Sequence, residues 1–206
     1  IVLDDGFQHR ALARDVDLVL VPGEGLPRRL LPAGRLREPA SGLARAHVVL
    51  ALGDERRLPG HPAVPPGVVT FVGRVLPTAA VVLADGRLAA HDLGILPRRR
   101  VVAVAGVARP ERFWALLDRL GIDVAARIRL PDHARYDRET LAILRAAVGS
   151  QGRAVVTTEK DLVKLAGLEG TDALRLHAVR IGVEIEQAEG LLACLVPPAE
   201  VALHPD

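Results

Sequence analysis

Short apolar runs alternate with amphipathic stretches along the second half of the chain. Val101–Ala105 is apolar without interruption, and in the stretch that follows Phe113, Leu116 and Leu117 recur with the spacing of one helical face. Strands that alternate with helices in this way form parallel sheets with right-handed crossovers. The sequence therefore predicts an α/β fold. The expected strands are 101–105, 124–130 and 154–158, the expected helices are 110–121, 137–148 and 160–165, and a final long strand or strand pair is expected at 176–185.

The first part of the chain also contains short apolar runs, separated by loops rich in turn residues. This pattern indicates the latter half of an α/β sheet, with strands at 1–5, 17–22 and 47–52 and a short helix at 40–46. The pair Asp85-Gly86 between two apolar runs predicts a hairpin further along. We expect three parts: a partial N-lobe at 1–66, a two-stranded β linker at 67–98 and a smaller α/β C-lobe with a parallel sheet at 99–206.

Composition narrows the functional classes. The net charge of +2 is too small for a nucleic-acid-binding surface. Cys194 is the only cysteine, so no internal disulfide can form, and its apolar neighbours favour a place in the core. No apolar run approaches the length of a membrane span. The chain contains no methionine, even at position 1, which predicts that it is a piece of a longer protein.

Asp4 and Asp5 are the first candidates for a chemical role. They end the apolar run Ile1–Leu3 and precede Gly6, so we expect them at the carboxyl end of a buried strand. Ligands of α/β proteins bind at that edge of the sheet. An apolar strand that ends in aspartate is typical of nucleotide enzymes, where the carboxylate holds Mg²⁺. A turn or helix-capping role for the two carboxylates stays open.

A long proline-rich loop carries the second candidate pair. Arg37 and Glu38 stand side by side near the end of the loop 22–39. A guanidinium suits phosphate, and a carboxylate suits a metal ion or the same guanidinium. An ordinary surface ion pair is the alternative.

Two further candidates follow predicted strands of the C-lobe. Asp132 and His133 come after the strand 124–130, where a histidine beside an aspartate suits acid–base chemistry; a simple turn accounts for the pair equally well. Residues 157–161 open a helix, where exposed amides and hydroxyls suit an anion. An N-cap formed by threonine and aspartate is the alternative there.

Taken together, these motifs resemble the tetraacyldisaccharide 4'-kinase family, the lipid A 4'-kinases. They occur in the family's order and at fitting spacings, and the resemblance covers nearly the whole chain. The segments that carry it are Asp4-Asp5-Gly6-Phe7-Gln8-His9, Leu31-Pro32-Ala33-Gly34, Leu36-Arg37-Glu38-Pro39, Ala105-Gly106-Val107-Ala108-Arg109-Pro110, Pro131-Asp132-His133 and Thr157-Thr158-Glu159-Lys160-Asp161.

The resemblance implies a P-loop kinase of two α/β lobes joined by a two-stranded linker. The family transfers the γ-phosphate of ATP to the 4'-hydroxyl of a tetraacylated glucosamine disaccharide 1-phosphate, a lipid A precursor, at the cytoplasmic face of the Gram-negative inner membrane. The implied cofactors are ATP and Mg²⁺, and no nucleic acid is involved. By resemblance, Asp4, Asp5 and Glu38 would hold the metal, Asp4, Asp5, Gln8 and Arg37 would bind the nucleotide, and His133, Asp5 and Arg37 would serve catalysis.

One part of the family pattern does not occur in this chain. The family's glycine-rich phosphate loop and its membrane-associated segment precede the Asp-Asp-Gly motif, and the chain contains no G-x-x-x-x-G-K-[ST] sequence. We therefore expect membrane association to depend on that missing segment, and the chain alone to lack transfer activity. Two other interpretations stay open: a non-catalytic module that binds an anionic glycolipid or a partner, and a metal-dependent hydrolase that uses Asp4, Asp5, Asp132 and His133.

Overall fold

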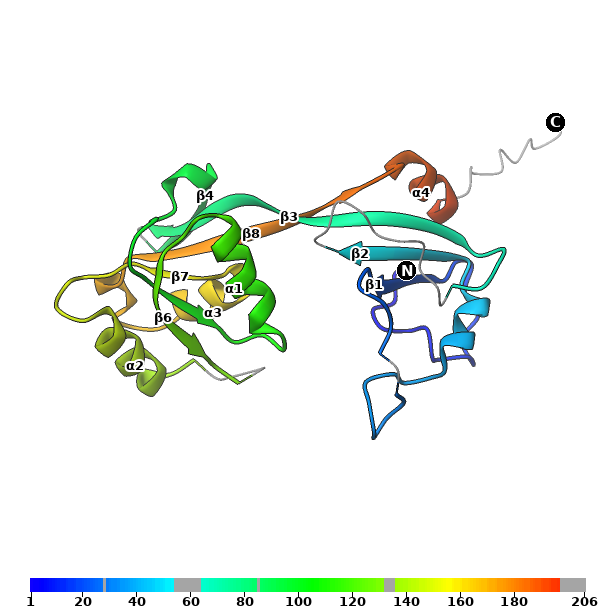
Figure 1. Ribbon diagram of the computed structural model, residues 1–206, viewed down its shortest axis with the longest axis horizontal. Helices are drawn as coiled ribbons and strands as arrows, with labels where there is room; N and C mark the ends of the chain where they lie inside the picture. Colours follow the sequence, from blue (N-terminus) through cyan, green and yellow to red (C-terminus); the bar gives the residue numbers. More distant parts are fainter. Residues whose placement is uncertain (28, 54–63, 85, 132–135, 197–206) are drawn as a thin grey trace, which may run out of the picture. The chain divides into compact units, whose positions relative to one another are not determined.

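The computed structural model describes residues 1–27, 29–53, 64–84, 86–131 and 136–196 (Figure 1). The chain forms two compact units: unit 1 consists of Ile1–Leu76 and Val183–Asp206, and unit 2 of Pro77–Gly182. This division differs from the expected ranges because the last residues of the chain belong with the first. Two long strands, β3 (Val69–Ala84) and β8 (Leu176–Ile185), each contribute residues to both units.

Unit 2 is an α/β unit built on a parallel sheet, as the sequence predicts. Its strands follow the order β8-β7-β5-β6. β5 (Val101–Ala105) is central and pairs in parallel with β6 (Val124–Arg129) and with β7 (Val155–Thr158), which in turn pairs in parallel with β8. Every residue of β5 is buried because helices cover both faces of the sheet.

The alternation of side chains along β5 separates two cores. Val101, Ala103 and Ala105 pack with the apolar face of α1 (Pro110–Arg119). Val102 and Val104 point to the other face and pack with α2 (Arg138–Val148) and α3 (Glu159–Ala166). Unit 2 therefore has three layers, with one helix on one side of the sheet and two on the other.

The predicted hairpin is present at the far end of β3. β4 (Arg87–His91) pairs with β3 in antiparallel fashion, with Ala84 opposite Arg87; Asp85 lies outside the described residues. The apolar run before this turn belongs to a single long strand, β3. β3 lies beside β8, and the contacts of Val72 with Glu186 and of Thr78 with Arg180 show that the two run in opposite directions.

Unit 1 contains a smaller parallel arrangement. β1 (Leu18–Pro22), β2 (Val48–Gly53) and β3 lie side by side in that order, near the strands and the short helix that the sequence predicts. One face of β2 packs under the 3-10 helix η1 (Ala40–Arg45), and the other packs against α4 (Ala188–Leu195), through Leu191. Cys194, expected in the core, is half-buried on α4.

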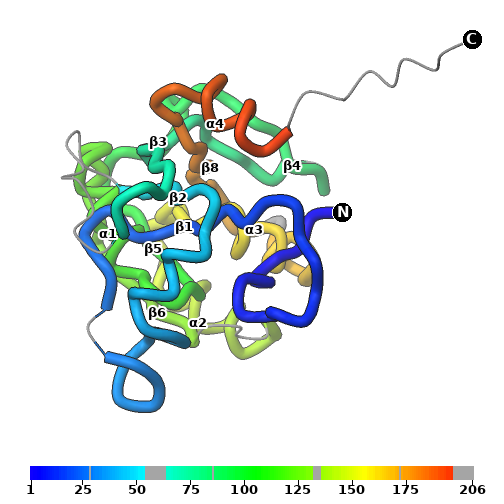
Figure 2. The backbone as a smooth tube through the Cα atoms, turned by 90° about the vertical axis from the view of Figure 1, so that its right-hand side faces the viewer, coloured from blue at the N-terminus to red at the C-terminus, as the bar shows by residue number. Residues whose placement is uncertain are grey.

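The strand predicted at residues 1–5 is absent, and this prediction was wrong. Residues 1–14 run as a loop outside the strands (Figure 2). Asp4 and Asp5 form a turn within this loop. A strand needs a neighbour with which to exchange backbone hydrogen bonds. In the part of the chain that the structure describes, no strand pairs with Ile1–Leu3, and their side chains are exposed.

Two smaller features complete the fold. Short 3-10 helices lie at Leu93–Ile95 (η2) and Thr171–Ala173 (η3). At the start of α3, Thr158 accepts a hydrogen bond from the Asp161 backbone N–H, so the capping alternative describes this motif. Among the described residues, no helix combines the length and apolarity needed to cross a bilayer.

Candidate functional site

An open hollow of about 300 Å³ in unit 1 brings together four of the predicted site residues. Asp5 and Gln8 reach it from the loop that precedes β1, and Arg37 and Glu38 from the end of the proline-rich loop. The two segments are far apart in the sequence but share one rim. The remaining lining is Phe7, Val19, Leu20, Val21, Leu26, Arg35, Leu36, Pro39, Ala40 and Leu43.

Arg37 and Asp5 form an ion pair across this rim. The Arg37 Nη1 lies 2.5 Å from Asp5 Oδ2, and the two side chains are 56% and 64% exposed. Asp5 has φ 57°, in the left-handed region that aspartate tolerates in turns. Because both groups are accessible, an incoming phosphate can exchange with the carboxylate as the partner of the guanidinium.

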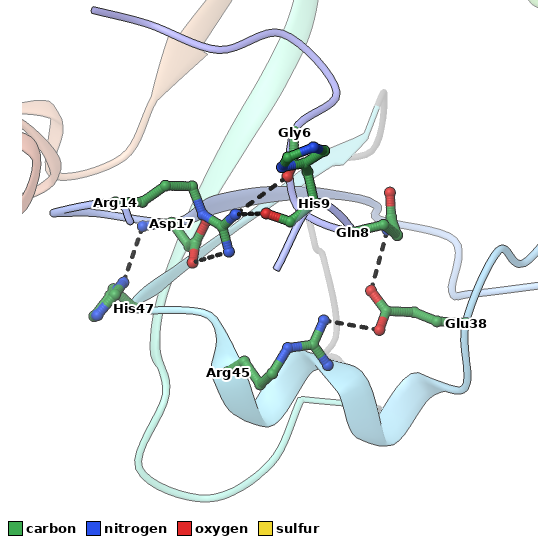
Figure 3. A network of polar contacts seen from close by, with 8 residues as sticks. All are labelled: Gly6, Gln8, His9, Arg14, Asp17, Glu38, Arg45 and His47. Carbon is green, nitrogen blue, oxygen red and sulfur yellow. Dashed lines mark hydrogen bonds and ion pairs between the residues drawn. The ribbon is translucent and has the colours of Figure 1, made fainter. Parts of the chain in front are cut away.

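Glu38 is held more firmly than Asp5. Its Oε1 accepts a hydrogen bond from Gln8 Nε2 at 3.1 Å, and its Oε2 accepts one from Arg45 Nη2 at 2.8 Å (Figure 3). Arg10 Nη2 lies 4.0 Å from the same oxygen. The Arg45 guanidinium also lies over the Phe7 ring, 4.7 Å from its centroid. This network joins the amino-terminal loop to η1 through one carboxylate.

The contacts of Glu38 make the stability of unit 1 depend on pH. Partial burial alone would raise the pKa of Glu38, but hydrogen bonds from Arg45 and Gln8 and the charges of Arg45 and Arg10 hold it below its ordinary value of 4.5. The ionised form is therefore favoured in the folded state. Its contribution to stability is complete above pH 4.5 and is lost as the pH falls through the lower folded-state pKa.

We therefore expect Glu38→Gln to lower the midpoint of urea unfolding at pH 7 and to lower it less at pH 3, which is below the ordinary pKa of 4.5. The measurement is the difference in midpoint between the variant and the parent chain at both pH values. Arg87→Gln, on the exposed strand β4 of unit 2, serves as a control for a changed surface charge. An equal deficit for Glu38→Gln at both pH values would contradict the pairing.

A second polar network braces the loop behind the hollow. Arg14 Nε lies 2.7 Å from Asp17 Oδ1, and a second nitrogen of Arg14 donates to the carbonyl oxygen of His9 (Figure 3). The backbone N–H of Asp17 donates to His47 Nδ1 at 2.9 Å. This role of His47 could not be predicted, because a contact between segments thirty residues apart leaves no local sequence pattern.

A family model described as tetraacyldisaccharide-1-P 4'-kinase matches residues 1–197, the greater part of the chain. The chain belongs to this family. Curated relatives named tetraacyldisaccharide 4'-kinase include one from Rhodospirillum centenum, 39% identical over 201 residues, and one from Anaeromyxobacter sp. (strain Fw109-5), 43% identical over 205 residues. The matches cover 96% and 94% of this chain but 55% and 54% of the relatives, so the chain spans about half their length.

A solved structure of the same family agrees with the fold. The structure of "apo" form LpxK from Aquifex aeolicus in complex with ATP matches with a TM-score of 0.69 at 29% identity, and the match covers 93% of this chain and 55% of that one. The P-loop kinase family and the mostly parallel α/β fold expected from the sequence are thus confirmed.

The other predicted site residues do not contribute to the hollow as the structure describes it. Asp4 is exposed and does not line it. Asp132 and His133 lie outside the described residues. Within the described ranges, no group of three histidine, cysteine, aspartate or glutamate side chains could hold a metal ion. The hollow itself presents two carboxylates, Asp5 and Glu38, each paired with an arginine.

Proposed function

We propose that the chain is the portion of a tetraacyldisaccharide 4'-kinase that carries the metal- and phosphate-binding loops of the site. The reaction is transfer of the γ-phosphate of ATP to the 4'-hydroxyl of a tetraacylated glucosamine disaccharide 1-phosphate in lipid A biosynthesis. The observation that carries the proposal is the convergence of Asp5, Gln8, Arg37 and Glu38 on one hollow in a chain of this family.

Phosphoryl transfer needs positioning and neutralisation of charge more than covalent chemistry. Arg37 presents a guanidinium on the rim and would bind the transferring phosphate in exchange for Asp5. Glu38 is ionised and oriented by Gln8 and Arg45, so it offers a fixed negative oxygen. Released from Arg37, Asp5 offers a second.

These oxygen donors fit Mg²⁺, which prefers one or two carboxylates and completes its coordination with phosphate and water. Asp5 and Glu38 line the hollow, and Asp4 is the neighbour of Asp5 in the sequence. Because no three such side chains come together in the described part of the chain, we assign the metal to Asp5 and Glu38 of the hollow rather than to all three carboxylates. When bound, Mg²⁺ would neutralise the charge of the phosphates. Gln8 and Asp4 would also contact the nucleotide, and His133 would support the base that accepts the hydroxyl proton.

The acceptor carries four acyl chains, so the proposed place of action is a membrane surface, the cytoplasmic face of the Gram-negative inner membrane. We propose peripheral association through the part of the kinase that precedes the Asp-Asp-Gly motif, together with the phosphate loop. Completing the site would require that part.

The test is a chimaera that joins to Ile1 of this chain the part of the Rhodospirillum centenum relative that the match does not cover, where we expect the family's phosphate loop. We expect transfer of label from radiolabelled ATP to the disaccharide lipid by the chimaera and none by the chain alone. Asp5→Asn and His133→Ala should each abolish most of the transfer, whereas Arg74→Gln, which removes the ion pair of β3 with Glu186, should not. A chimaera that folds and binds ATP but transfers nothing would overturn the proposal.

A further inference from the structure

The strand order of unit 2 reverses at β5, and the carboxyl ends of β5 and β7 meet at this position. Among the parallel strands β5 to β8, β5 comes first in the chain, β6 lies on one side of it and β7 lies on the other. The loops after β5 and β7 consequently lead to helices on opposite faces, α1 and α3. In open α/β sheets, ligand sites form at the carboxyl ends of strands where the order reverses in this way. Gly106 follows β5 at this point, and Asp161 lies in the first turn of α3.

Asp161 ties the two diverging segments together. Its side chain is completely buried. Oδ2 accepts hydrogen bonds from the Gly106 backbone N–H at 2.9 Å and from Thr158 Oγ1 at 2.8 Å. An ionised group is costly to bury unless its oxygens are paired. The other oxygen, Oδ1, has no such hydrogen bond among the described residues. Only one of the two carboxylate oxygens of Asp161 is therefore paired.

The second oxygen of Asp161 faces the same glycine as the hydroxyl of Tyr136. A Cβ atom built on Gly106 would lie 2.6 Å from the Tyr136 hydroxyl and 3.2 Å from Asp161 Oδ1, so a glycine is needed for these atoms to come so close. The hydroxyl is buried and likewise has no other hydrogen-bond partner among the described residues. Lys164 Nζ lies 5.1 Å from the centroid of the Tyr136 ring. Three sequence-distant segments thus meet at one buried carboxylate.

Burial and the adjacent Asp161 carboxylate raise the pKa of Tyr136 far above its ordinary value. The phenol therefore keeps its proton at neutral pH, and that proton faces a buried acceptor. Each group supplies what the other lacks: a donor hydrogen for Oδ1, and a buried acceptor for the hydroxyl.

We propose that Asp161 and Tyr136 form a positioning pair for the transfer reaction, which fixes the turn at Gly106 and the chain that leads into α2. This inference rests on the proposed function, because Tyr136 follows His133 by three residues in the sequence. Tyr136 is the first described residue after His133, and the pair would fix the position of this tyrosine. The pair touches no reacting atom in this assignment and acts through the placement of its neighbours.

The first test needs no kinase activity. Tyr136 is the only tyrosine, so the near-ultraviolet absorbance of phenolate reports this residue alone. In the parent chain we expect ionisation only where the protein unfolds. Asp161→Asn should bring the transition of the folded protein down towards the ordinary value of about 10, and Gly106→Ala should do the same by displacing the hydroxyl. Glu159→Gln, which neutralises a carboxylate of α3 paired instead with Arg180, is the matched control.

An unchanged Tyr136 titration in folded Asp161→Asn and in Gly106→Ala would overturn the pair. If Asp161→Asn does not fold, Gly106→Ala alone decides. The second test uses the chimaera: Tyr136→Phe keeps the ring and should lower kcat ~10- to 100-fold with little change in KM for ATP. Parental kcat in Tyr136→Phe would overturn the positioning role. An inactive parent chimaera would instead contradict the proposed function. The Tyr136 titration would still test whether Asp161 and Tyr136 form a pair.

Discussion

Replacing Arg37 with alanine in the chimaera should lower kcat by ~100- to 1,000-fold, the cost of removing one group that is positioned to stabilise developing charge. Arg37 stands on the rim of the hollow, and its side chain is 56% exposed and pairs with the exposed carboxylate of Asp5. Its removal should therefore change phosphate binding and leave the fold intact. The measurement is the initial rate of phosphate transfer at saturating ATP and lipid.

Two variants separate the charge of Arg37 from its shape. Arg37→Lys keeps the charge but loses the planar fork that engages two phosphate oxygens, so we expect an intermediate rate. Arg87→Ala removes an exposed arginine from β4 in unit 2 and should leave kcat unchanged. Equal rates for Arg37→Ala and Arg87→Ala would remove Arg37 from the site.

Leu117→Ala should lower the free energy of unfolding of unit 2 by about 2–5 kcal/mol. Leu117 lies on α1, is completely buried and packs in the core between that helix and β5. Truncation leaves a cavity that a sheet buried on both faces cannot easily fill. Trp114, the only tryptophan, lies on the same helix beside Phe113 and reports unfolding of this unit by fluorescence in urea.

The matched control is Ile143→Ala on α2, where the side chain is 45% exposed. It removes a similar volume from the surface of the same unit and should cost well under half as much as Leu117→Ala. Comparable losses for the two variants would mean that the core between α1 and β5 is less tightly packed than the structure shows.

The α/β character of unit 2 was predictable because each element carries its own local signal. The continuous apolar run of β5, Pro110 at the start of α1 and Asp137 before α2 mark their elements without reference to the rest of the chain. The failure at residues 1–5 has the same origin. An apolar run forms a strand only where a neighbouring strand pairs with it. The residues of the run do not reveal whether such a neighbour is present.

The candidate site shows the same difference between what local sequence motifs predict and what depends on the fold. Asp5, Gln8, Arg37 and Glu38 were found as motif residues, and the structure brings them to one hollow. The arrangement of their partners could not be predicted. Arg45 holds Glu38 from a neighbouring helix, and Asp161 reaches back from α3 to Gly106 at the end of β5. Such contacts depend on the path of the chain in space, and a single sequence does not display that path.

The division of the chain has a consequence for the order in which the protein is made. Phe71 of β3 and Val48 of β2 share a core with Leu191, which leaves the ribosome after all of residues 77–182. Synthesis thus delivers every residue of the inserted segment before the amino-terminal strands receive their covering helix. During translation, unit 2 is therefore expected to fold first. Strands β1 and β2 of unit 1 can complete their core only after α4 has been synthesised.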